Sequence, residues 1–175
     1  MSGREDGLER QRGSVDPLGF GVFATQDFRQ GDYICQYEGD WMHPDAADYF
    51  VEKGLRSPEY QMWVNKYVGG KLNTFVVDAS RSLWEKTMGR NINHSIPDAN
   101  VVQRLFVSVK HNYMAIYFKA IRDIKKGEEI LYNYGDTRYG TTLGKWSPMI
   151  YKQGRAAYRR TCVSLEDDGN DLFRC

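Results

Sequence analysis

An uncharged polar stretch, Asn91-Ile92-Asn93-His94-Ser95, stands between a Gly-Arg pair and a run of β-forming residues. Asparagine and serine side chains readily bond to nearby backbone, so the stretch could be a simple turn. The same amide and imidazole groups could instead hold a cofactor. His94 has only His43 and His111 as possible histidine partners, without matching carboxylate spacing, which argues against a metal site.

Tyrosine hydroxyls form a second group of chemically useful side chains. Tyr132 and Tyr134 lie two residues apart in a strand-like segment, so their side chains should point the same way. Gly135 follows and would allow another backbone to approach closely. Tyr37 ends another predicted strand, just before Glu38-Gly39. These phenols could form a half-buried aromatic face or could orient a substrate.

A glycine pair flanks Phe20 in Gly19-Phe20-Gly21, just before a predicted strand. This spacing alone is compatible with a tight turn. Glycines also let a backbone approach a ligand and present its N–H and C=O groups to it.

The elements that must hold these groups are short. We predict strands over 21–25, 32–39, 59–67, 73–80, 100–109, 113–121 and within 123–135, and helices over 43–54 and 147–160. Alternation within 32–39 would place Tyr33, Cys35 and Tyr37 on one face. Residues 69–73 are expected to form a hairpin loop around Gly69-Gly70. Strands do not alternate with long helices, which favours several small twisted sheets over a parallel dinucleotide-binding sheet.

Composition narrows the functional classes. The chain has 175 residues, 41% hydrophobic and 27% charged, which fits one domain. A net charge of +1 gives no strong signal for direct nucleic-acid binding. Three widely spaced cysteines favour neither a disulfide framework nor a zinc site, and indicate reduced thiols. No apolar run suggests a membrane span, and residues 1–14 are so polar that we expect a mobile tail.

Together and in this order, four segments resemble the SET domain of protein-lysine methyltransferases, from about Leu18 to Trp146. These segments are residues 19–21, 77–80, 89–95 and 127–136. Within the family, the histone H4 monomethyltransferases look most similar, through the stretches QYEGD, VVDAS, GRNINHS and ILYNYGD. The resemblance implies a mainly β SET-domain fold of several small twisted sheets with short helices and a C-terminal pseudoknot. After the mobile tail expected at 1–14, the SET domain would span 15–146, and a C-terminal helix and tail at 147–175 would close the site.

The resemblance also implies the cofactor and the roles of residues. S-adenosylmethionine would be the methyl donor, with S-adenosylhomocysteine as product and no metal. Tyr134 matches the tyrosine taken as catalytic, Tyr37 would line the lysine channel, and Tyr132 takes a position where Tyr favours a single methyl transfer. The implied cofactor-binding residues are Leu18, Gly19, Phe20, Gly21, Tyr60, Arg90, Asn93, His94 and Trp146.

The implied function is transfer of a methyl group to a histone lysine, histone H4 favoured, mainly giving monomethyl-lysine. Methyl transfer from a sulfonium needs a neutral amine, and an apolar channel lowers the pKa of lysine accordingly. The expected partners are a histone tail or another lysine-containing peptide, with the nucleosome as a further candidate and no membrane. The expected location is the nucleus, as a chromatin regulator. The alternatives are a non-histone lysine methyltransferase and a catalytically inactive SET-like binding module.

Overall fold

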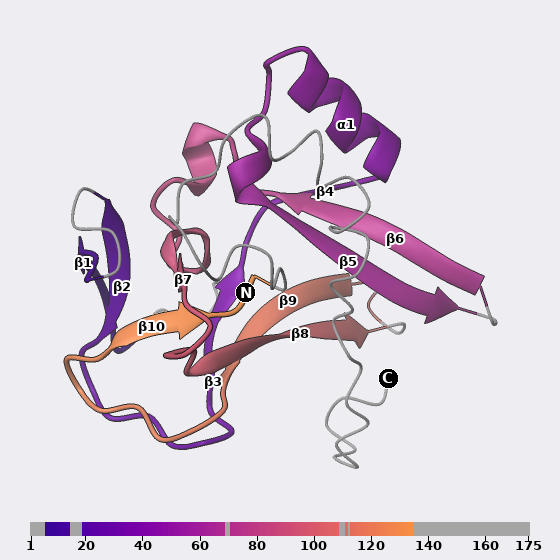
Figure 1. The fold of residues 1–175 in the computed structure, drawn as a ribbon. Helices are drawn as coiled ribbons and strands as arrows, with labels where there is room; N and C mark the ends of the chain where they lie inside the picture. Colours follow the sequence, from indigo (N-terminus) through magenta and orange to yellow (C-terminus); the bar gives the residue numbers. More distant parts are fainter. Residues whose placement is uncertain (1–5, 15–18, 69–70, 109–110, 112, 135–175) are drawn as a thin grey trace.

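The computed structural model describes residues 6–14, 19–68, 71–108, 111 and 113–134 (Figure 1). Within these ranges the strands are β1 (Leu8–Arg12), β2 (Phe20–Ala24), β3 (Tyr33–Tyr37), β4 (Asp40–Met42), β5 (Gln61–Val68), β6 (Lys71–Asp78), β7 (Asn93–His94), β8 (Val101–Ser108), β9 (Tyr113–Ala120) and β10 (Glu129–Tyr132). The helical elements are α1 (Pro44–Glu52) and the 3-10 turns η1 (Pro58–Tyr60), η2 (Ser82–Trp84) and η3 (Gly89–Asn91).

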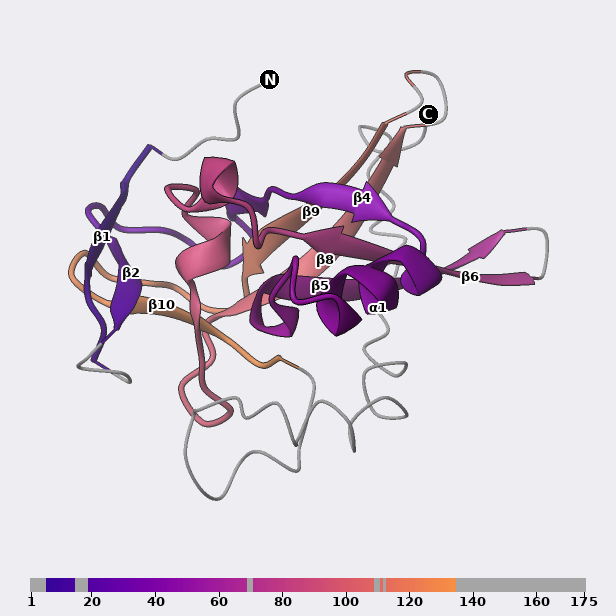
Figure 2. The ribbon, with the colours of Figure 1, turned by 90° about the horizontal axis from the view of Figure 1, so that it is seen from above.

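The strands form two sheets, which confirms the mainly β architecture. The larger sheet has the order β1-β2-β10-β8-β9-β3, with β7 paired to β10, and the smaller has the order β4-β6-β5. Helix α1 lies against the smaller sheet, and in both ribbon views the β5–β6 hairpin extends away from the rest of the molecule (Figures 1 and 2). No described helix is long and apolar enough to cross a membrane.

Strand β10 is enclosed by segments from earlier in the chain. It pairs antiparallel with β2 and parallel with β7 and β8. The buried side chain of Asn100 fixes this junction: its Nδ2 donates to the Glu129 carbonyl at 2.8 Å, and its Oδ1 accepts from the Leu131 N–H at 2.9 Å. These pairings are the described part of the predicted pseudoknot. The helix expected at 147–160 lies outside the described residues.

The prediction of a mobile tail is wrong for the part of residues 1–14 that the structure describes. Leu8–Arg12 forms β1, which pairs antiparallel with β2 from Leu8 opposite Ala24 to Arg12 opposite Phe20. Leu8 is buried in the core, whereas the next four side chains are exposed. An edge strand with a single buried side chain is held mainly by backbone hydrogen bonds, so its polar composition gave no sign of it.

The predicted alternation along β3 is also wrong at its start. The register against β9 shifts between Tyr33 and Cys35, and Ile34 and Cys35 are both buried while Tyr33 is exposed. A bulge adds one residue to a strand and shifts the faces of the residues beside it. Tyr37, beyond the bulge, points into the core as expected.

The smaller sheet follows the sequence more closely. Pro44 occupies the first turn of α1, the His43 Nδ1 accepts from the Asp45 N–H at 3.3 Å, and Gly54 after the helix has φ of +68°. Strands β5 and β6 pair without a break from Gln61 opposite Asp78 to Val68 opposite Lys71. Residues 71–73 therefore belong to β6 and not to the predicted loop, and Gly69-Gly70 lie outside the described residues.

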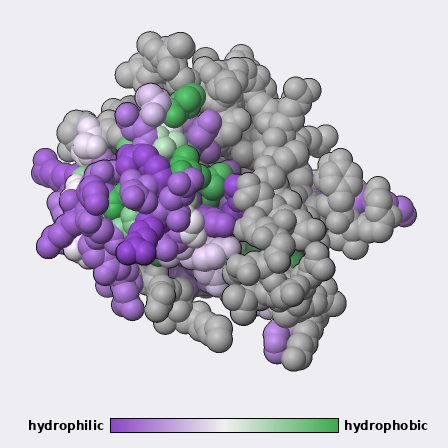
Figure 3. Space-filling view, turned by 90° about the horizontal axis from the view of Figure 1, so that it is seen from below, coloured by the Kyte–Doolittle hydropathy of each residue, from purple (hydrophilic) through white to green (hydrophobic). Residues whose placement is uncertain are grey.

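Where described residues form the surface seen from below, it is largely hydrophilic, with the hydrophobic residues in small separate groups (Figure 3). Buried residues from both sheets form one core, which includes Val22, Ile34, Val64 and Ile116. The partly buried Tyr60 and Tyr134 pack against this core. Through these two residues the core borders the site described next.

Candidate active site

Aromatic side chains from four separate segments form a continuous row. The ring centroids of Tyr37 and Phe118 lie 6.4 Å apart, those of Phe118 and Tyr132 4.7 Å, those of Tyr132 and Tyr134 4.4 Å, and those of Tyr134 and His94 4.9 Å. Strand β10 carries Tyr132 and pairs with both β7 and β8, and this pairing brings Tyr132 to the middle of the row. The structure thus brings all three predicted catalytic tyrosines together.

Two of these phenols are held by backbone carbonyl groups. The Tyr37 hydroxyl donates to the Tyr60 carbonyl at 2.7 Å, and the Tyr134 hydroxyl donates to the Ile92 carbonyl at 2.8 Å. Burial raises the pKa of both phenols well above the usual range, and the closeness of Tyr134 raises the pKa of Tyr37 further. At neutral pH each hydroxyl is therefore uncharged and uses its proton in the hydrogen bond to the backbone carbonyl. Its oxygen can still accept a hydrogen bond.

The stretch around Asn93 and His94 does more than turn the chain. As β7 it runs parallel to β10, and the His94 Nδ1 accepts from the Tyr134 backbone N–H at 3.1 Å. The Asn93 Nδ2 donates to the Phe20 carbonyl at 3.0 Å and to Glu129 Oε1 at 2.9 Å. One short strand thus joins the predicted glycine-containing loop to the aromatic row.

Gly21 is required by this close packing. A Cβ at this position would overlap the carboxylate of Glu129 and lie 3.1 Å from the Asn93 Nδ2. At this position the missing side chain leaves room for the Glu129 carboxylate and the Asn93 amide. Close approach to a ligand, which is one of the two interpretations of the glycine pair, stays a prediction.

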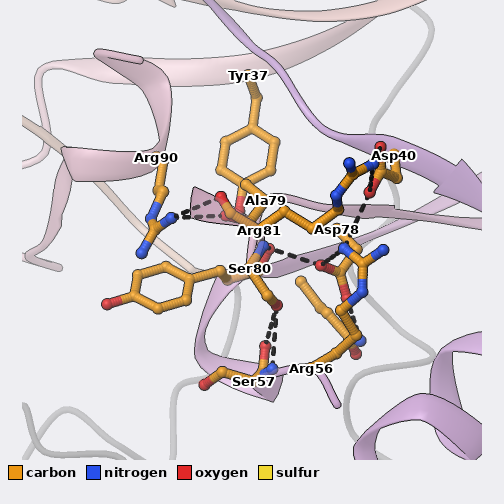
Figure 4. A network of polar contacts seen from close by, with 11 residues as sticks. Tyr37, Asp40, Arg56, Ser57, Asp78, Ala79, Ser80, Arg81 and Arg90 are labelled. Atoms are coloured by element: carbon orange, nitrogen blue, oxygen red, sulfur yellow. Dashed lines mark hydrogen bonds and ion pairs between the residues drawn. The ribbon is translucent and has the colours of Figure 1, made fainter. Parts of the chain in front are cut away.

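Arg90 and Tyr60 stack on one another beside the row. The guanidinium carbon of Arg90 lies 3.8 Å from the centroid of the Tyr60 ring, and its Nη1 donates to the carbonyls of Ala79 at 2.9 Å and Arg81 at 3.3 Å (Figure 4). This stacking orients Tyr60, whose carbonyl in turn accepts from the Tyr37 hydroxyl.

A network of polar contacts surrounds Asp78 next to the start of β5 (Figure 4). The fully buried Asp78 accepts from the Arg56 Nη1 at 3.2 Å and from the Gln61 Nε2 at 2.7 Å. Arg56 also pairs with Asp40 at 2.9 Å. A buried carboxylate needs such partners, so this network fixes the start of β5 next to the site.

The remaining predicted residues are placed less centrally. Phe20 is 53% exposed, and the Arg10 guanidinium lies 4.3 Å from the centroid of its ring. The contact of Phe20 with Asn93 is made by the Phe20 backbone carbonyl. The Gly19 carbonyl accepts from the Gly13 N–H at 3.1 Å. Leu18 and Trp146 lie outside the described residues. Within the described part of the chain, no group of three or more His, Cys, Asp or Glu residues could hold a metal ion.

Three participants were not identified from the sequence. Phe118 sits between Tyr37 and Tyr132, Glu129 holds Asn93, and Arg10 covers Phe20. Alternation along 113–121 would have placed Phe118 on a buried face but could not show what it contacts. Glu129 stands next to Glu128 after a Lys-Lys-Gly turn, so it reads as part of a charged, solvated segment.

Comparison with known proteins places this geometry in a family. The model of the SET domain matches residues 19–135. The chain is 33% identical over 137 residues to the N-lysine methyltransferase KMT5A-A of Danio rerio, covering 77% of this chain and 37% of that protein. It is 28% identical over 139 residues to the histone-lysine N-methyltransferase EZH2 of Chaetomium thermophilum, covering 71% and 8% respectively. The chain thus spans well under half the length of these curated relatives.

Solved structures show the same fold. The crystal structure of CpSET8 from Cryptosporidium has a TM-score of 0.60 at 24% identity, covering 78% of this chain and 59% of that one. The methyltransferase domain of human PR domain-containing protein 2 has a TM-score of 0.51 at 20% identity, covering 75% and 80%.

Proposed function

Because this chain belongs to the SET-domain family, we propose that it is a protein-lysine N-methyltransferase that uses S-adenosylmethionine. The proposed substrate is a lysine of a histone, histone H4 first, and the proposed main product is monomethyl-lysine. The observation that carries the proposal is the convergence of Tyr37, Tyr132 and Tyr134 in one aromatic row beside Asn93 and His94. The 33% identity to a protein named as an N-lysine methyltransferase supports the same reaction.

The row suits a neutral amine nucleophile. Aromatic and apolar surroundings disfavour an ammonium and so lower the pKa of a lysine that enters them. The Tyr37 and Tyr134 hydroxyls donate to backbone carbonyls, so their oxygens are left to accept hydrogen bonds from the amine N–H groups. Such contacts hold the nitrogen in one direction for an in-line displacement, and this alignment can supply a large part of the catalysis.

Neither of these phenols acts as the general base in this scheme. Their raised pKa values keep them protonated at neutral pH, so they orient the amine without removing its proton. The lysine loses its proton to solvent before the transfer.

The residues near Asn93 fit the proposed cofactor. S-adenosylmethionine, when bound, supplies the electrophilic methyl group. Gly19, Phe20 and Gly21 would offer backbone groups to its methionine part, and Asn93 and His94 would contact it from β7. Tyr60 and Arg90 would line the neighbouring side, and Leu18 and Trp146 would complete the site. The hydrogen bond from the Asn93 amide to the Phe20 carbonyl, which holds these two segments side by side, supports this placement.

The packing of Tyr132 supports a single methyl transfer. Its side chain is 8% exposed and lies between Phe118 and Tyr134. A hydroxyl in so confined a position leaves little room for a nitrogen that already carries a methyl group. We therefore expect monomethyl-lysine as the main product.

The proposed substrate and location rest on the names of the relatives. Relatives named for N-lysine and histone-lysine methylation support a histone tail as partner and chromatin in the nucleus as location. A non-histone lysine remains the alternative substrate. Nucleosome binding is proposed only through the histone tail, since a net charge of +1 offers no general attraction to DNA.

The experiment compares the native protein with Tyr134→Phe, using labelled cofactor on core histones and on a peptide array. We expect the variant to bind S-adenosylhomocysteine but to transfer methyl groups about 100-fold more slowly, because the amine loses one orienting oxygen. Tyr49→Phe is the matched control, since Tyr49 is exposed on α1 and should leave the rate unchanged.

Different failures point to different errors. A native protein that binds S-adenosylhomocysteine but methylates neither histones nor peptides would be a SET-like binding module. Methylation of array peptides without histones would indicate a non-histone substrate. A native protein that does not bind the cofactor product would refute the proposed function altogether.

A further inference from the structure

Glu129, the first residue of β10, is a buried acid that the catalytic scheme does not use. Only 7% of the residue is exposed. Its Oε1 accepts from the Asn93 Nδ2 at 2.9 Å, and its Oε2 accepts from the backbone N–H of Ser14 at 2.7 Å and from the Ser14 hydroxyl. All these partners are donors, so the side chain fits its site as an ionised carboxylate. Among the described residues, none of the ion pairs includes Glu129.

These contacts fix the orientation of the Asn93 amide. One of its two N–H groups donates to the Phe20 carbonyl at 3.0 Å and the other to Glu129. Turning the amide over would place its oxygen against two acceptors and leave both without a donor. The amide oxygen, Oδ1, must therefore point away from Glu129, where it can only accept.

The site is thus prepared for a cation with N–H groups. It combines an acceptor oxygen directed away from Glu129 with a buried carboxylate whose hydrogen-bond partners, among the described residues, are all neutral donors. In a low-dielectric setting such a charge attracts a positive group strongly. In S-adenosylmethionine the ammonium of the amino-acid part is the one cationic group that can donate a hydrogen bond.

We propose that Glu129 is a positioning residue that holds Asn93 Oδ1 towards the ammonium group of the cofactor and adds negative charge beside it. The inference rests on the proposed function. Gly21 supports it independently, because a Cβ there would occupy the space of the Glu129 carboxylate. Ser14, which follows β1, binds the other oxygen of the same carboxylate, so the N-terminal strand helps to hold the cofactor site.

The test replaces Glu129 with glutamine, which keeps the shape but exchanges one acceptor oxygen for an amide donor. That donor must face either the Asn93 amide or the Ser14 N–H, so one of the two contacts becomes repulsive. Titration calorimetry would compare S-adenosylhomocysteine with its analogue that lacks the amino group. The native protein should prefer the aminated ligand. The variant should lose about 10- to 100-fold of that preference, as expected for a hydrogen bond to a charged group.

Glu128→Gln is the matched control. Glu128 is the preceding residue, removes the same charge when replaced, and pairs instead with Arg122 at 2.7 Å near the surface. Its replacement should leave the preference for the amino group unchanged. Glu129→Asp is the second variant, because it keeps the charge but is one methylene too short to reach both Asn93 and Ser14. It should reduce the preference as well.

The outcomes separate this inference from the proposed function. If the native protein binds neither ligand, the proposed function itself fails. If it binds the aminated ligand better and both Glu129 variants keep the full preference, Glu129 has no positioning role although the function stands. Equal weakening of both ligands in a folded variant would show a structural effect only and would also overturn the inference.

Discussion

Replacing Gly89 with alanine would add a methyl group where η3 crosses β3. An ideal Cβ at this position would overlap the Gln36 carbonyl oxygen and lie 2.9 Å from the Tyr37 Cα. Ordinary contacts between carbon atoms are about 3.5–4 Å, so the two backbones must separate by about 0.5–1 Å. No flexible side chain can absorb this movement, because the atoms involved belong to the main chain.

The separation would disturb both ends of the aromatic row at once. Tyr37 lies on the displaced strand, and the segment after Gly89 carries the Ile92 carbonyl that holds the Tyr134 hydroxyl. A misplacement of about 1 Å can cost about 100-fold in rate. Overpacking of this kind costs about 1–3 kcal/mol of folding free energy, or roughly 2–10 °C in melting temperature. We therefore expect kcat/KM for methyl transfer to fall about 100-fold in a protein that still folds.

The matched control is Gly54→Ala. Gly54 has φ of +68° after α1, with nothing within 4 Å of an added Cβ, so alanine there is strained but clashes with nothing. The left-handed conformation costs about 1–2 kcal/mol, a loss of stability similar to that at Gly89. Its rate should remain that of the native protein. Gly89→Ala with native kcat/KM, or Gly54→Ala with an equally reduced one, would refute the reasoning.

Three further predictions concern Tyr132, Arg56 and Tyr37. Tyr132→Phe should raise the share of dimethyl-lysine measured by mass spectrometry of a modified peptide; an unchanged product ratio would contradict the confinement argument. Arg56→Met should destabilise the fold by about 3–5 kcal/mol in chemical denaturation, because the buried Asp78 carboxylate loses its ion-pair partner. The control Arg81→Met removes a more exposed ion pair with Asp40 and should cost less than about 1 kcal/mol. Because burial raises the pKa of Tyr37, its contribution to stability should be complete below about pH 10, the unfolded value, and should be lost as pH rises further. Tyr37→Phe should reduce the alkaline slope of the unfolding free energy by up to about 1.4 kcal/mol per pH unit, and an unchanged slope would argue against a buried phenol.

Local rules predicted the elements whose own sequence determines them. The helix after His43 has a proline in its first turn and a glycine beyond its end, and the long hairpin strands are rich in β-formers. Tyr132 and Tyr134 stand two residues apart, which predicted a shared side correctly. In each case the deciding interactions lie within a few residues of one another.

What could not be predicted depends on partners distant in sequence. Strand β1 exists because β2 offers a hydrogen-bonding edge, and the bulge in β3 arises from its pairing with β9. Glu129 appeared to belong to a charged turn, because its sequence does not show that Asn93 and Ser14 would surround its carboxylate. The tyrosines could be selected as a set only through the family resemblance, since spacing alone cannot bring Tyr37 to Tyr134.

The enclosed position of β10 sets an order of events during folding. Its neighbours β2, β7 and β8 are all synthesised before it. The larger sheet stays incomplete until residues 129–132 have left the ribosome, because β10 joins these neighbours. Until then the nascent chain carries open strand edges, which are prone to pair with other chains. Because Tyr132 and Tyr134 arrive with this strand, we expect catalytic competence to appear only in the final stage of folding, after most of the polypeptide has already collapsed.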